Sequence, residues 1–472
     1  MKRTLSLDLL RGLTIFGMIL SSMIPFGDAL PAWMYHGQEP PPLHTFNPLL
    51  AGITWVDLVL PIFIFCMGAA IPLALNKKIE NGISTSKIML NVVKRFFMLV
   101  AFAIYIAHIL PNAIGEGKWN FTLWGNKTMG LDLQLLTLLG FALLFPMYMV
   151  FKNKKYMLPA RIIGWGGALF LLLFFHFAYG QSFSLFRNNI IILLLGNVYL
   201  VGAISWYFTR KSWTTRFALF ALWGAIQLCC KSTGFDTVLD DFKPLSWMFI
   251  FRMTHYMLLL IPATIVGDML LNRQKSGFDI KKVITNSFSV HLFFITMAII
   301  VIWLTVSMYM RWLTAAYIIT PLILVGLYLV VLKKLPEYRQ MFLLAVYLVM
   351  MGLILEPVEG GIKKDHATAS YMVLTAGMAL CLLMFFDYIC RFVPTSGFVR
   401  LFSNAGSNPL MAYMGGSWFM MPFLKATLLI GLYGLLYPEE YPWIGVLRAV
   451  GLVVVIMFLV GILTKRKIIW RA

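Results

Sequence analysis

Long, uninterrupted apolar runs recur along the whole chain, and they limit its possible folds more than any other feature. A helix that crosses the hydrocarbon core of a bilayer needs about 20 predominantly apolar residues. Because backbone polar groups inside a membrane must be hydrogen-bonded internally, continuous spans of this length form helices. The sequence therefore predicts an all-α, polytopic transmembrane helix bundle of about 11–14 spans. The runs lie near residues 8–26, 54–76, 90–110, 129–151, 160–179, 189–208, 214–231, 247–271, 286–308, 312–332, 340–355, 368–390, 408–424 and 442–464.

The composition agrees with a membrane protein and excludes several other classes. Of the 472 residues, 60% are hydrophobic and only 12% are charged, with a mean hydropathy of +0.82. A cytosolic enzyme, a secreted disulfide scaffold and a disordered chain all require a more polar composition. An outer-membrane β-barrel requires alternating strands of about ten residues instead of continuous runs. The loop before residue 54 is the longest, so residues 1–472 are predicted to form one transmembrane domain without a soluble domain.

The charges predict an orientation in the membrane. The chain carries 39 Lys and Arg against 19 Asp and Glu, a net charge of +20. Nucleic acid is excluded as a partner, because binding it requires a soluble basic surface. When successive loops are assigned to alternate sides, cations favour the side of the amino terminus by about three to one. Both termini are therefore predicted to face the cytoplasm, with the acidic loops outside and the lipid bilayer as the surrounding partner.

The predicted external loop at residues 25–53 contains the first candidate catalytic group. Its prolines and aromatic residues indicate an ordered segment at the membrane interface. It contains His36 and His44 and leads into the second apolar run, where Asp57 is an ionisable group just inside a helix. One interpretation makes His44 or His36 a general base that Asp57 orients. The alternative is that Asp57 only caps the amino terminus of its helix.

A second ionisable pair lies at the start of the chain. Asp8 and Arg11 are three residues apart, so both lie on one helix face at the predicted cytoplasmic boundary. They could form an ion pair that seats the helix. They could also recognise the phosphate of a ligand that enters from the cytoplasm, since arginine suits that chemistry.

Other chemistry is excluded by the motifs that the sequence lacks. There is no GxxxxGK[ST], GxSxG or HExxH motif, which argues against an ATP-driven pump, a serine hydrolase and a zinc protease. The five cysteines have no His or Cys at metal-ligand spacing, so no metal site is predicted. The further polar residues inside the apolar runs indicate a polar bundle interior.

Several segments resemble the heparan-α-glucosaminide N-acetyltransferase family of transmembrane acyltransferases. The opening Ser-Leu-Asp-x-x-Arg-Gly at 6–12 is similar to that family's S-(L/V)-D-x-(F/L)-R-G start. The segment at 52–63 reads G-I-T-W-V-D-L-V-L-P-I-F, close to the family's G-(L/I)-T-x-x-D-L-V-F-P-x-F. Weaker similarities occur at 364–371, which resembles K-x-x-W-x-x-S-Y, and at 404–413. Together these segments bracket nearly the whole chain.

The resemblance implies acetyl transfer across a membrane. The family moves an acetyl group from cytosolic acetyl-CoA to an amino sugar on the far side, using a histidine in the first external loop. Carried over to this chain, that histidine is His44, with His36 as a second candidate and Asp57 as its neighbour. On the donor side the resemblance implies Asp8 and Arg11, together with Ser370 and Asn408 from the two weaker segments, as acetyl-CoA-binding residues.

We therefore expect a multi-pass acetyltransferase of the bacterial inner membrane that uses acetyl-CoA to acetylate a sugar, with an amino sugar favoured, at the periplasmic face. Such a protein needs no metal, and a homodimer is a candidate assembly. The alternative from a different class is a sugar or oligosaccharide permease, in which the same polar interior is a transport path. Direct transfer and transfer through an acetyl-histidine intermediate both stay open.

Overall fold

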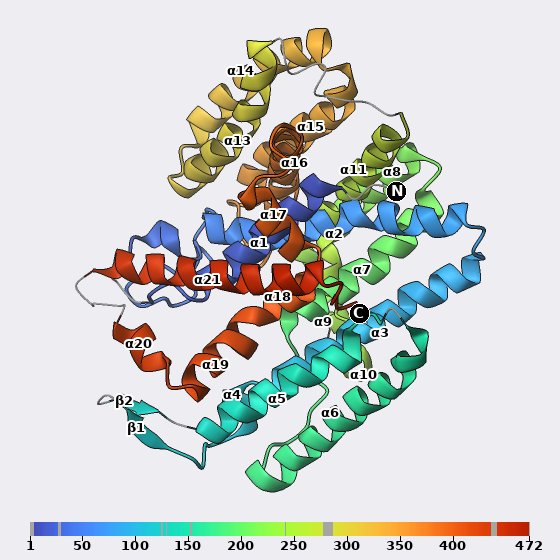
Figure 1. The fold of residues 1–472 in the computed structure, drawn as a ribbon. Helices are drawn as coiled ribbons and strands as arrows, with labels where there is room; N and C mark the ends of the chain where they lie inside the picture. Colours follow the sequence, from blue (N-terminus) through green and yellow to red (C-terminus); the bar gives the residue numbers. More distant parts are fainter. Residues whose placement is uncertain are drawn as a thin grey trace.

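The computed structural model describes residues 4–26, 30–123, 126–128, 130–151, 153–240, 242–276, 287–435 and 441–471. Long helices pack side by side through this part of the chain, with α13 and α14 at one edge and α5 and α6 at the opposite edge (Figure 1). The long helices are α1 (Leu5–Ser21), α2 (Trp55–Glu80), α3 (Thr85–His108), α5 (Leu131–Tyr148), α6 (Met157–Tyr179), α7 (Ile190–Thr209), α8 (Trp213–Thr233), α11 (Met257–Ser276), α13 (Phe288–Tyr309), α14 (Leu313–Lys334), α15 (Arg339–Val358), α16 (Ala369–Phe392) and α21 (Pro442–Lys465).

Shorter elements connect the long helices. A two-stranded antiparallel hairpin pairs Phe121 with Thr128. Its strands are β1 (Phe121–Leu123) and β2 (Asn126–Thr128). The short helices are η1 (Ala32–Met34), α4 (Pro111–Ile114), η2 (Lys154–Tyr156), α9 (Phe235–Asp240), α10 (Lys243–Ser246), η3 (Phe251–Tyr256), η4 (Pro336–Tyr338), α17 (Gly397–Gly406), α18 (Pro409–Met414), η5 (Gly415–Met420), α19 (Met421–Ala426) and α20 (Ile430–Leu435).

The predicted all-α polytopic bundle is confirmed. Every apolar run forms helix, and within the described residues 11 helices are long and apolar enough to cross a membrane. Three of the predicted spans fall outside that set. The first, α1, has 17 residues, and α8 is less apolar. The third, residues 408–424, is helical without a break from 409 to 426, but it is assigned as three consecutive elements, α18, the π-helical turn η5 and α19, and Gly415 and Gly416 begin the π-helical turn. Such π-helical turns occur often at functional sites.

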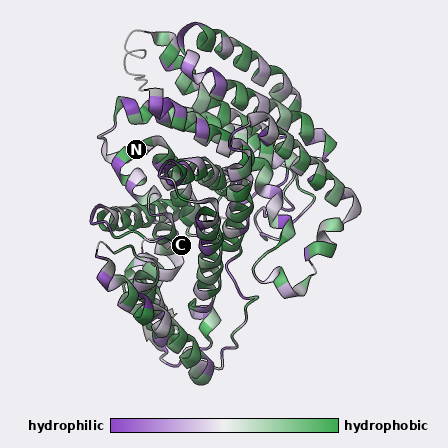
Figure 2. Ribbon diagram, turned by 90° about the vertical axis from the view of Figure 1, so that its right-hand side faces the viewer, coloured by the Kyte–Doolittle hydropathy of each residue, from purple (hydrophilic) through white to green (hydrophobic). Residues whose placement is uncertain are grey.

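The burial of the helices separates a core from a lipid-facing periphery. In the central helices α11 and α16, 94% and 78% of the residues in the most apolar stretch are buried. In the peripheral helices α6 and α14 the corresponding shares are 22% and 28%. Hydrophobic residues predominate along the helices (Figure 2). A helix that exposes apolar side chains along its length is stable against lipid and not against water. The protein is thus a multi-pass membrane protein.

The two ends of the bundle can be recognised from polar contacts between helix termini. At one end, which we call the His36 face, the Tyr371 hydroxyl donates to the Asp57 carbonyl oxygen at 2.6 Å and joins the first turns of α16 and α2. At the opposite end, which we call the amino-terminal face, Arg273 bonds to Asp387 at 3.2 Å. There Lys275 also pairs with Glu80 at 2.9 Å. The 26 residues of α2 separate the two faces by about 39 Å.

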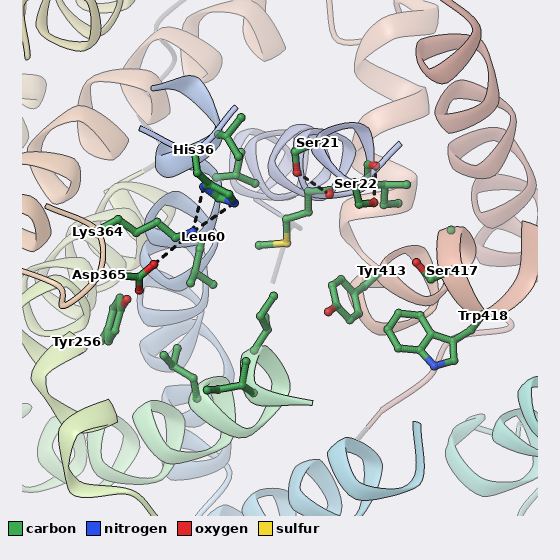
Figure 3. Close-up of a pocket in the computed structure, with 18 residues that line it drawn as sticks. Ser21, Ser22, His36, Leu60, Tyr256, Lys364, Asp365, Tyr413, Ser417 and Trp418 are labelled. Atoms are coloured by element: carbon green, nitrogen blue, oxygen red, sulfur yellow. Dashed lines mark hydrogen bonds and ion pairs between the residues drawn. The ribbon is translucent and has the colours of Figure 1, made fainter. Parts of the chain in front are cut away.

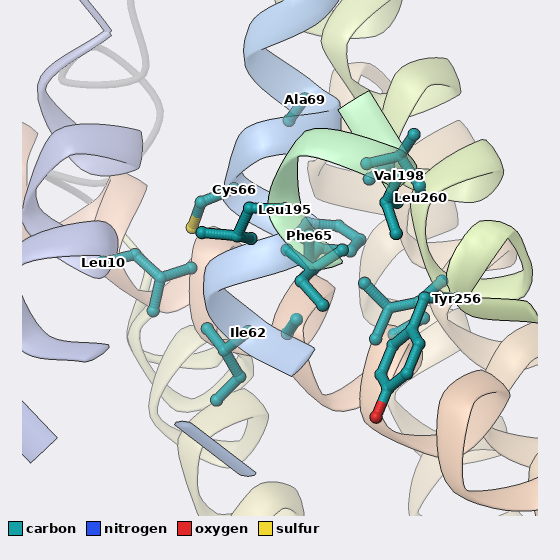
Figure 4. Close-up of a cluster of buried hydrophobic side chains, with 14 of the residues drawn as sticks. Leu10, Ile62, Phe65, Cys66, Ala69, Leu195, Val198, Tyr256 and Leu260 are labelled. Atoms are coloured by element: carbon teal, nitrogen blue, oxygen red, sulfur yellow. The ribbon is translucent and has the colours of Figure 1, made fainter. Parts of the chain in front are cut away.

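Between the two faces the interior is apolar and closely packed. Leu10 of α1 points toward Cys66 of α2, and Phe65 and Leu195 lie beside them (Figure 4). Leu10, Phe65 and Cys66 are at most 1% exposed. This layer, defined by Leu10, Phe65, Cys66 and Leu195, lies between the candidate site described next and the amino-terminal face.

Candidate active site

A histidine and a carboxylate meet at the amino terminus of α2. His36 Nδ1 lies 2.8 Å from Asp57 Oδ1, and the Asp57 side chain is only 2% exposed. The other carboxylate oxygen, Oδ2, accepts hydrogen bonds from the backbone N–H groups of Gly37 at 3.0 Å and Thr54 at 2.9 Å. One oxygen therefore caps the helix while the other holds the imidazole. The capping role of Asp57 is observed, and the contact with His36 is the one that the catalytic interpretation requires.

The contact with Asp57 orients the His36 ring. A carboxylate that accepts two backbone N–H bonds can only accept from the imidazole as well, so the hydrogen of the ring is placed on Nδ1. The second nitrogen, Nε2, then keeps its lone pair. A histidine oriented in this way is the usual general base of acyl-transfer sites.

His44 has a different environment. Its ring stacks on Phe26 with centroids 4.0 Å apart and meets the edge of Tyr35 at 4.5 Å. Its Nδ1 lies 3.1 Å from the carbonyl oxygen of Glu39. These contacts hold the turn of the loop in place. Of the two candidate histidines, the structure thus brings His36 to the Asp57 carboxylate. The predicted loop at 25–53 is described except for residues 27–29, which lie outside the described residues.

A second loop brings a lysine to His36. Lys364 Nζ lies 3.0 Å from Nδ1 and 3.3 Å from Nε2 of the imidazole. The side-chain amide of Gln38 holds this loop in position: its oxygen accepts from the backbone N–H of Asp365 at 2.8 Å, and its nitrogen donates to the Asp365 carbonyl oxygen. Gln38 is 4% exposed, so these two bonds are shielded from water. Residues more than 300 positions apart are thereby brought together.

Carboxylates also organise the start of α16 beside this loop. Glu359 accepts from the backbone N–H groups of Ala369 at 3.0 Å and Ser370 at 2.6 Å. The hydroxyl of Thr368 accepts from the N–H of Tyr371 at 3.2 Å and caps the helix. Free N–H groups at a helix start favour negative charge and hydroxyl oxygens of this kind. Ser370 is therefore a buried part of the α16 terminus on the His36 face.

His36 and Lys364 line a cavity of about 490 Å³ (Figure 3). Its polar side is formed by His36, Lys364, Asp365 and Tyr256, and Tyr413, Ser417 and Trp418 lie across from them. Its apolar wall comes from the ends of α1, α2 and α7 that lie on the His36 face. A pocket of this size with a few convergent polar groups is typical of a small-molecule site. The remaining lining residues are Met18, Ile19, Ser21, Ser22, Val56, Val59, Leu60, Ile190, Ile191, Leu194 and Gly416.

The residues predicted to bind acetyl-CoA do not come together in this cavity. Arg11 bonds to Asp8 at 3.5 Å and to the carbonyl oxygens of Cys66 and Gly406, each at 3.3 Å. Its guanidinium thus joins α1 to α2 and α17, which favours the ion pair that seats the helix over phosphate recognition. Asn408 bonds to the backbone of the carboxyl-terminal segment, donating to Ile468 at 2.9 Å. Ser370 lies on the His36 face. The four residues therefore lie in three separate places: Asp8 and Arg11 together, Asn408 at the carboxyl-terminal segment, and Ser370 at the start of α16.

Several residues of the site were missed by the sequence-based prediction, among them Gln38, Lys364 and the cavity-lining Tyr256. Gln38 has no feature in the sequence that distinguishes it from other loop residues. Lys364 occurs in the weak similarity at 364–371 but was not assigned a role. Within the described residues, no group of three or more His, Cys, Asp or Glu side chains is arranged to hold a metal ion.

Comparison with known proteins assigns the chain to a family. No curated protein matches the chain. The family described as "Domain of unknown function (DUF5009)" matches residues 3–270, which contain His36, Asp57 and Tyr256 but not Lys364. Because this match covers more than half of the chain, the protein belongs to the DUF5009 family.

Proposed function

We propose that the protein is a transmembrane acetyltransferase that moves an acetyl group from cytosolic acetyl-CoA to a sugar, with an amino sugar favoured, at the periplasmic face of the bacterial inner membrane. The observation that carries this proposal is the His36–Asp57 pair on the wall of a cavity. The cavity lies at the face that the charge distribution of the loops predicts to be external. The resemblance of the segments around Asp8 and Asp57 to transmembrane acyltransferases supports the same reaction.

His36 acts as the general base in this mechanism. Its Nε2 takes a proton from the amine or hydroxyl of the acceptor, whose freed lone pair attacks the carbonyl carbon of the acetyl thioester. The new bond forms as the carbon–sulfur bond breaks, and CoA leaves as a thiolate that is then protonated. Asp57 stabilises the imidazolium that forms during the step. In the alternative route the acetyl group rests on Nε2 before it is transferred.

The donor has to reach the cavity from the opposite side. Acetyl-CoA is anionic, and the predicted cytoplasmic loops carry most of the cations of the chain. The apolar layer of Leu10, Phe65, Cys66 and Leu195 separates this side from His36 (Figure 4). The proposal therefore requires that α1 and the helices beside it move apart during turnover, so that the acetyl-bearing end of acetyl-CoA can enter the cavity.

The test is a transfer assay with a matched pair of histidine variants. The protein is reconstituted in vesicles with radiolabelled acetyl-CoA on the side of the amino terminus and glucosamine on the other. We expect labelled N-acetylglucosamine to form. His36→Gln should lower the rate by about 100-fold or more, which is the contribution typical of a general base.

His44→Gln is the control for this assay, because it removes an imidazole from the same loop without touching the Asp57 pair. It should retain most of the activity. Loss of activity in His44→Gln together with full activity in His36→Gln would refute the assignment of the base. If glucosamine crosses the membrane unmodified while the acetyl group stays on CoA, the transferase proposal fails and the permease takes its place.

A further inference from the structure

Lys364 places a primary amine of the protein itself at the catalytic base. Its Nζ is 3.3 Å from His36 Nε2, the nitrogen that takes a proton from the acceptor in the proposed mechanism. Its side chain is 19% exposed and lines the same cavity as His36 (Figure 3). The amine is thus enclosed with the reacting groups and not displayed on the surface. It is also the same functional group as the acceptor amine of an amino sugar.

The loop that carries Lys364 is held on both sides. Gln38 bonds to the backbone of Asp365, as described above, and the Gly52 N–H donates to the Ile362 carbonyl oxygen at 2.8 Å. Within the loop, the Lys363 N–H donates to the Thr368 hydroxyl at 3.1 Å. Because the backbone around Lys364 is fixed, its amine stays near His36. Enclosure at short range raises the effective concentration of one reactant near another by orders of magnitude.

We infer that Lys364 is a self-acetylation site. This inference rests on the proposed function. His36 Nε2 takes one proton from the Lys364 ammonium and releases it to water, and the resulting amine attacks the carbonyl carbon of the acetyl thioester. A carbon–nitrogen bond forms and the carbon–sulfur bond breaks. The attacking nitrogen then loses its second proton, which the departing CoA thiolate takes up. The products are free CoA and an amide on Lys364, one per chain.

The modification changes the cavity in two ways. The amide has no charge, so the cation beside His36 and Asp57 is lost, and the added acetyl group occupies space in the cavity. Amides hydrolyse too slowly for the acetyl group to be passed on, so the modified chain is a slower enzyme and not an intermediate. An acceptor that fills the cavity separates Lys364 from the acetyl donor. Protection of Lys364 is therefore a way to find the natural acceptor.

The experiment uses the purified full-length protein with deuterated acetyl-CoA and no sugar, followed by peptide mass spectrometry over time. We expect Lys364 to be acetylated about 100-fold faster than Lys231. Lys231 is the matched control, because it lies on the same face, is 49% exposed and pairs with Glu359 outside the cavity. His36→Gln should reduce the rate at Lys364 to that at Lys231, and His44→Gln should not. Glucosamine should slow the reaction at Lys364 only.

Lys364→Arg provides a second test of self-acetylation, and this test does not require that the His36→Gln variant folds correctly. It keeps a cation in the loop but removes the acetylatable amine, so the fast incorporation should vanish. If wild-type protein acetylates glucosamine while Lys364 reacts no faster than Lys231, self-acetylation is refuted and the proposed function stands. If neither glucosamine nor Lys364 is acetylated, the proposed function itself is refuted.

Discussion

At the scale of single residues, Asp57 shows how one side chain can satisfy a helix terminus and orient an imidazole at the same time. Its two oxygens divide these tasks between the backbone of Gly37 and Thr54 and the ring of His36. A carboxylate buried to 2% exposure is costly unless it is fully bonded, and here each oxygen has partners. The same contacts that make this carboxylate tolerable in the membrane also fix the direction of the imidazole.

Asp57→Asn tests this double role, because it preserves the size of the side chain but removes its charge. We expect acetyl transfer to fall by about 100-fold or more, since the neutral amide neither selects the tautomer nor stabilises the imidazolium. Because the oxygen of the amide can still accept a hydrogen bond at the helix terminus, the stability of the protein should fall by no more than about 1 kcal/mol. Transfer rates and thermal unfolding in detergent measure the two effects separately.

Glu39→Gln is the control for this variant, because it neutralises a carboxylate of the same loop and leaves the Asp57 pair intact. It should change neither the rate nor the stability appreciably. An Asp57→Asn protein that transfers acetyl groups at the normal rate would contradict the role of the pair.

At the scale of helices, the position of α1 depends on direct backbone contact with α17. A methyl group added to Gly12 would lie 2.0 Å from the Phe402 carbonyl oxygen, and one added to Gly406 would lie 1.9 Å from the Asp8 carbonyl oxygen. Small residues permit this close approach between membrane helices. The crossing places Arg11 against the carbonyl oxygens of Cys66 and Gly406, and it sets the end of α1 that lines the cavity.

Gly12→Ala and Gly406→Ala should each destabilise the protein, because the added methyl group meets backbone atoms that cannot move aside. The expected loss is about 1–3 kcal/mol or more for each substitution, as for other overpacked sites. Gly326→Ala in the interior of α14 is the matched control, since nothing lies within 4 Å of its added methyl group. Thermal unfolding followed by tryptophan fluorescence compares the three. Equal stability of all of them would rule out the close crossing.

At the scale of the whole molecule, the two faces of the bundle differ in cavity and charge. The His36 face carries the cavity, and the loops of the opposite face hold most of the cations that predict a cytoplasmic location. Two adjacent cysteines near the end of α8 can be used as probes of this orientation. Cys229 is exposed and Cys230 is buried, and both lie close to Lys231 on the His36 face.

In intact cells we expect a membrane-impermeant maleimide to label Cys229 from outside. The variant Cys230→Ser, which keeps Cys229, should be labelled, and Cys229→Ser, which keeps Cys230, should not. Gel-shift analysis of the tagged protein before and after permeabilisation measures the labelling. Labelling of Cys229 only after permeabilisation would place the His36 face in the cytoplasm and reverse the predicted topology.

The all-α bundle was predictable from the sequence, because apolar length alone decides which segments form membrane helices. The limits of that rule are visible at residues 408–424. One apolar run was predicted there, and the helix is indeed continuous from 409 to 426, but its middle turn, η5, is π-helical. The helical state follows from local composition, whereas the hydrogen-bonding pattern of each turn depends on how its backbone packs.

The candidate site was predictable only in part. Asp57 and a histidine of the preceding loop were apparent from the sequence, because 21 positions or fewer separate them. The choice between His36 and His44, the arrival of Lys364 and the dispersal of Arg11, Ser370 and Asn408 were decided by the tertiary structure. Local chemistry specifies which side chains require a partner. Which partner each one meets depends on the packing of α16 against α2 and on the bonds between Gln38 and Asp365, which join segments more than 300 residues apart.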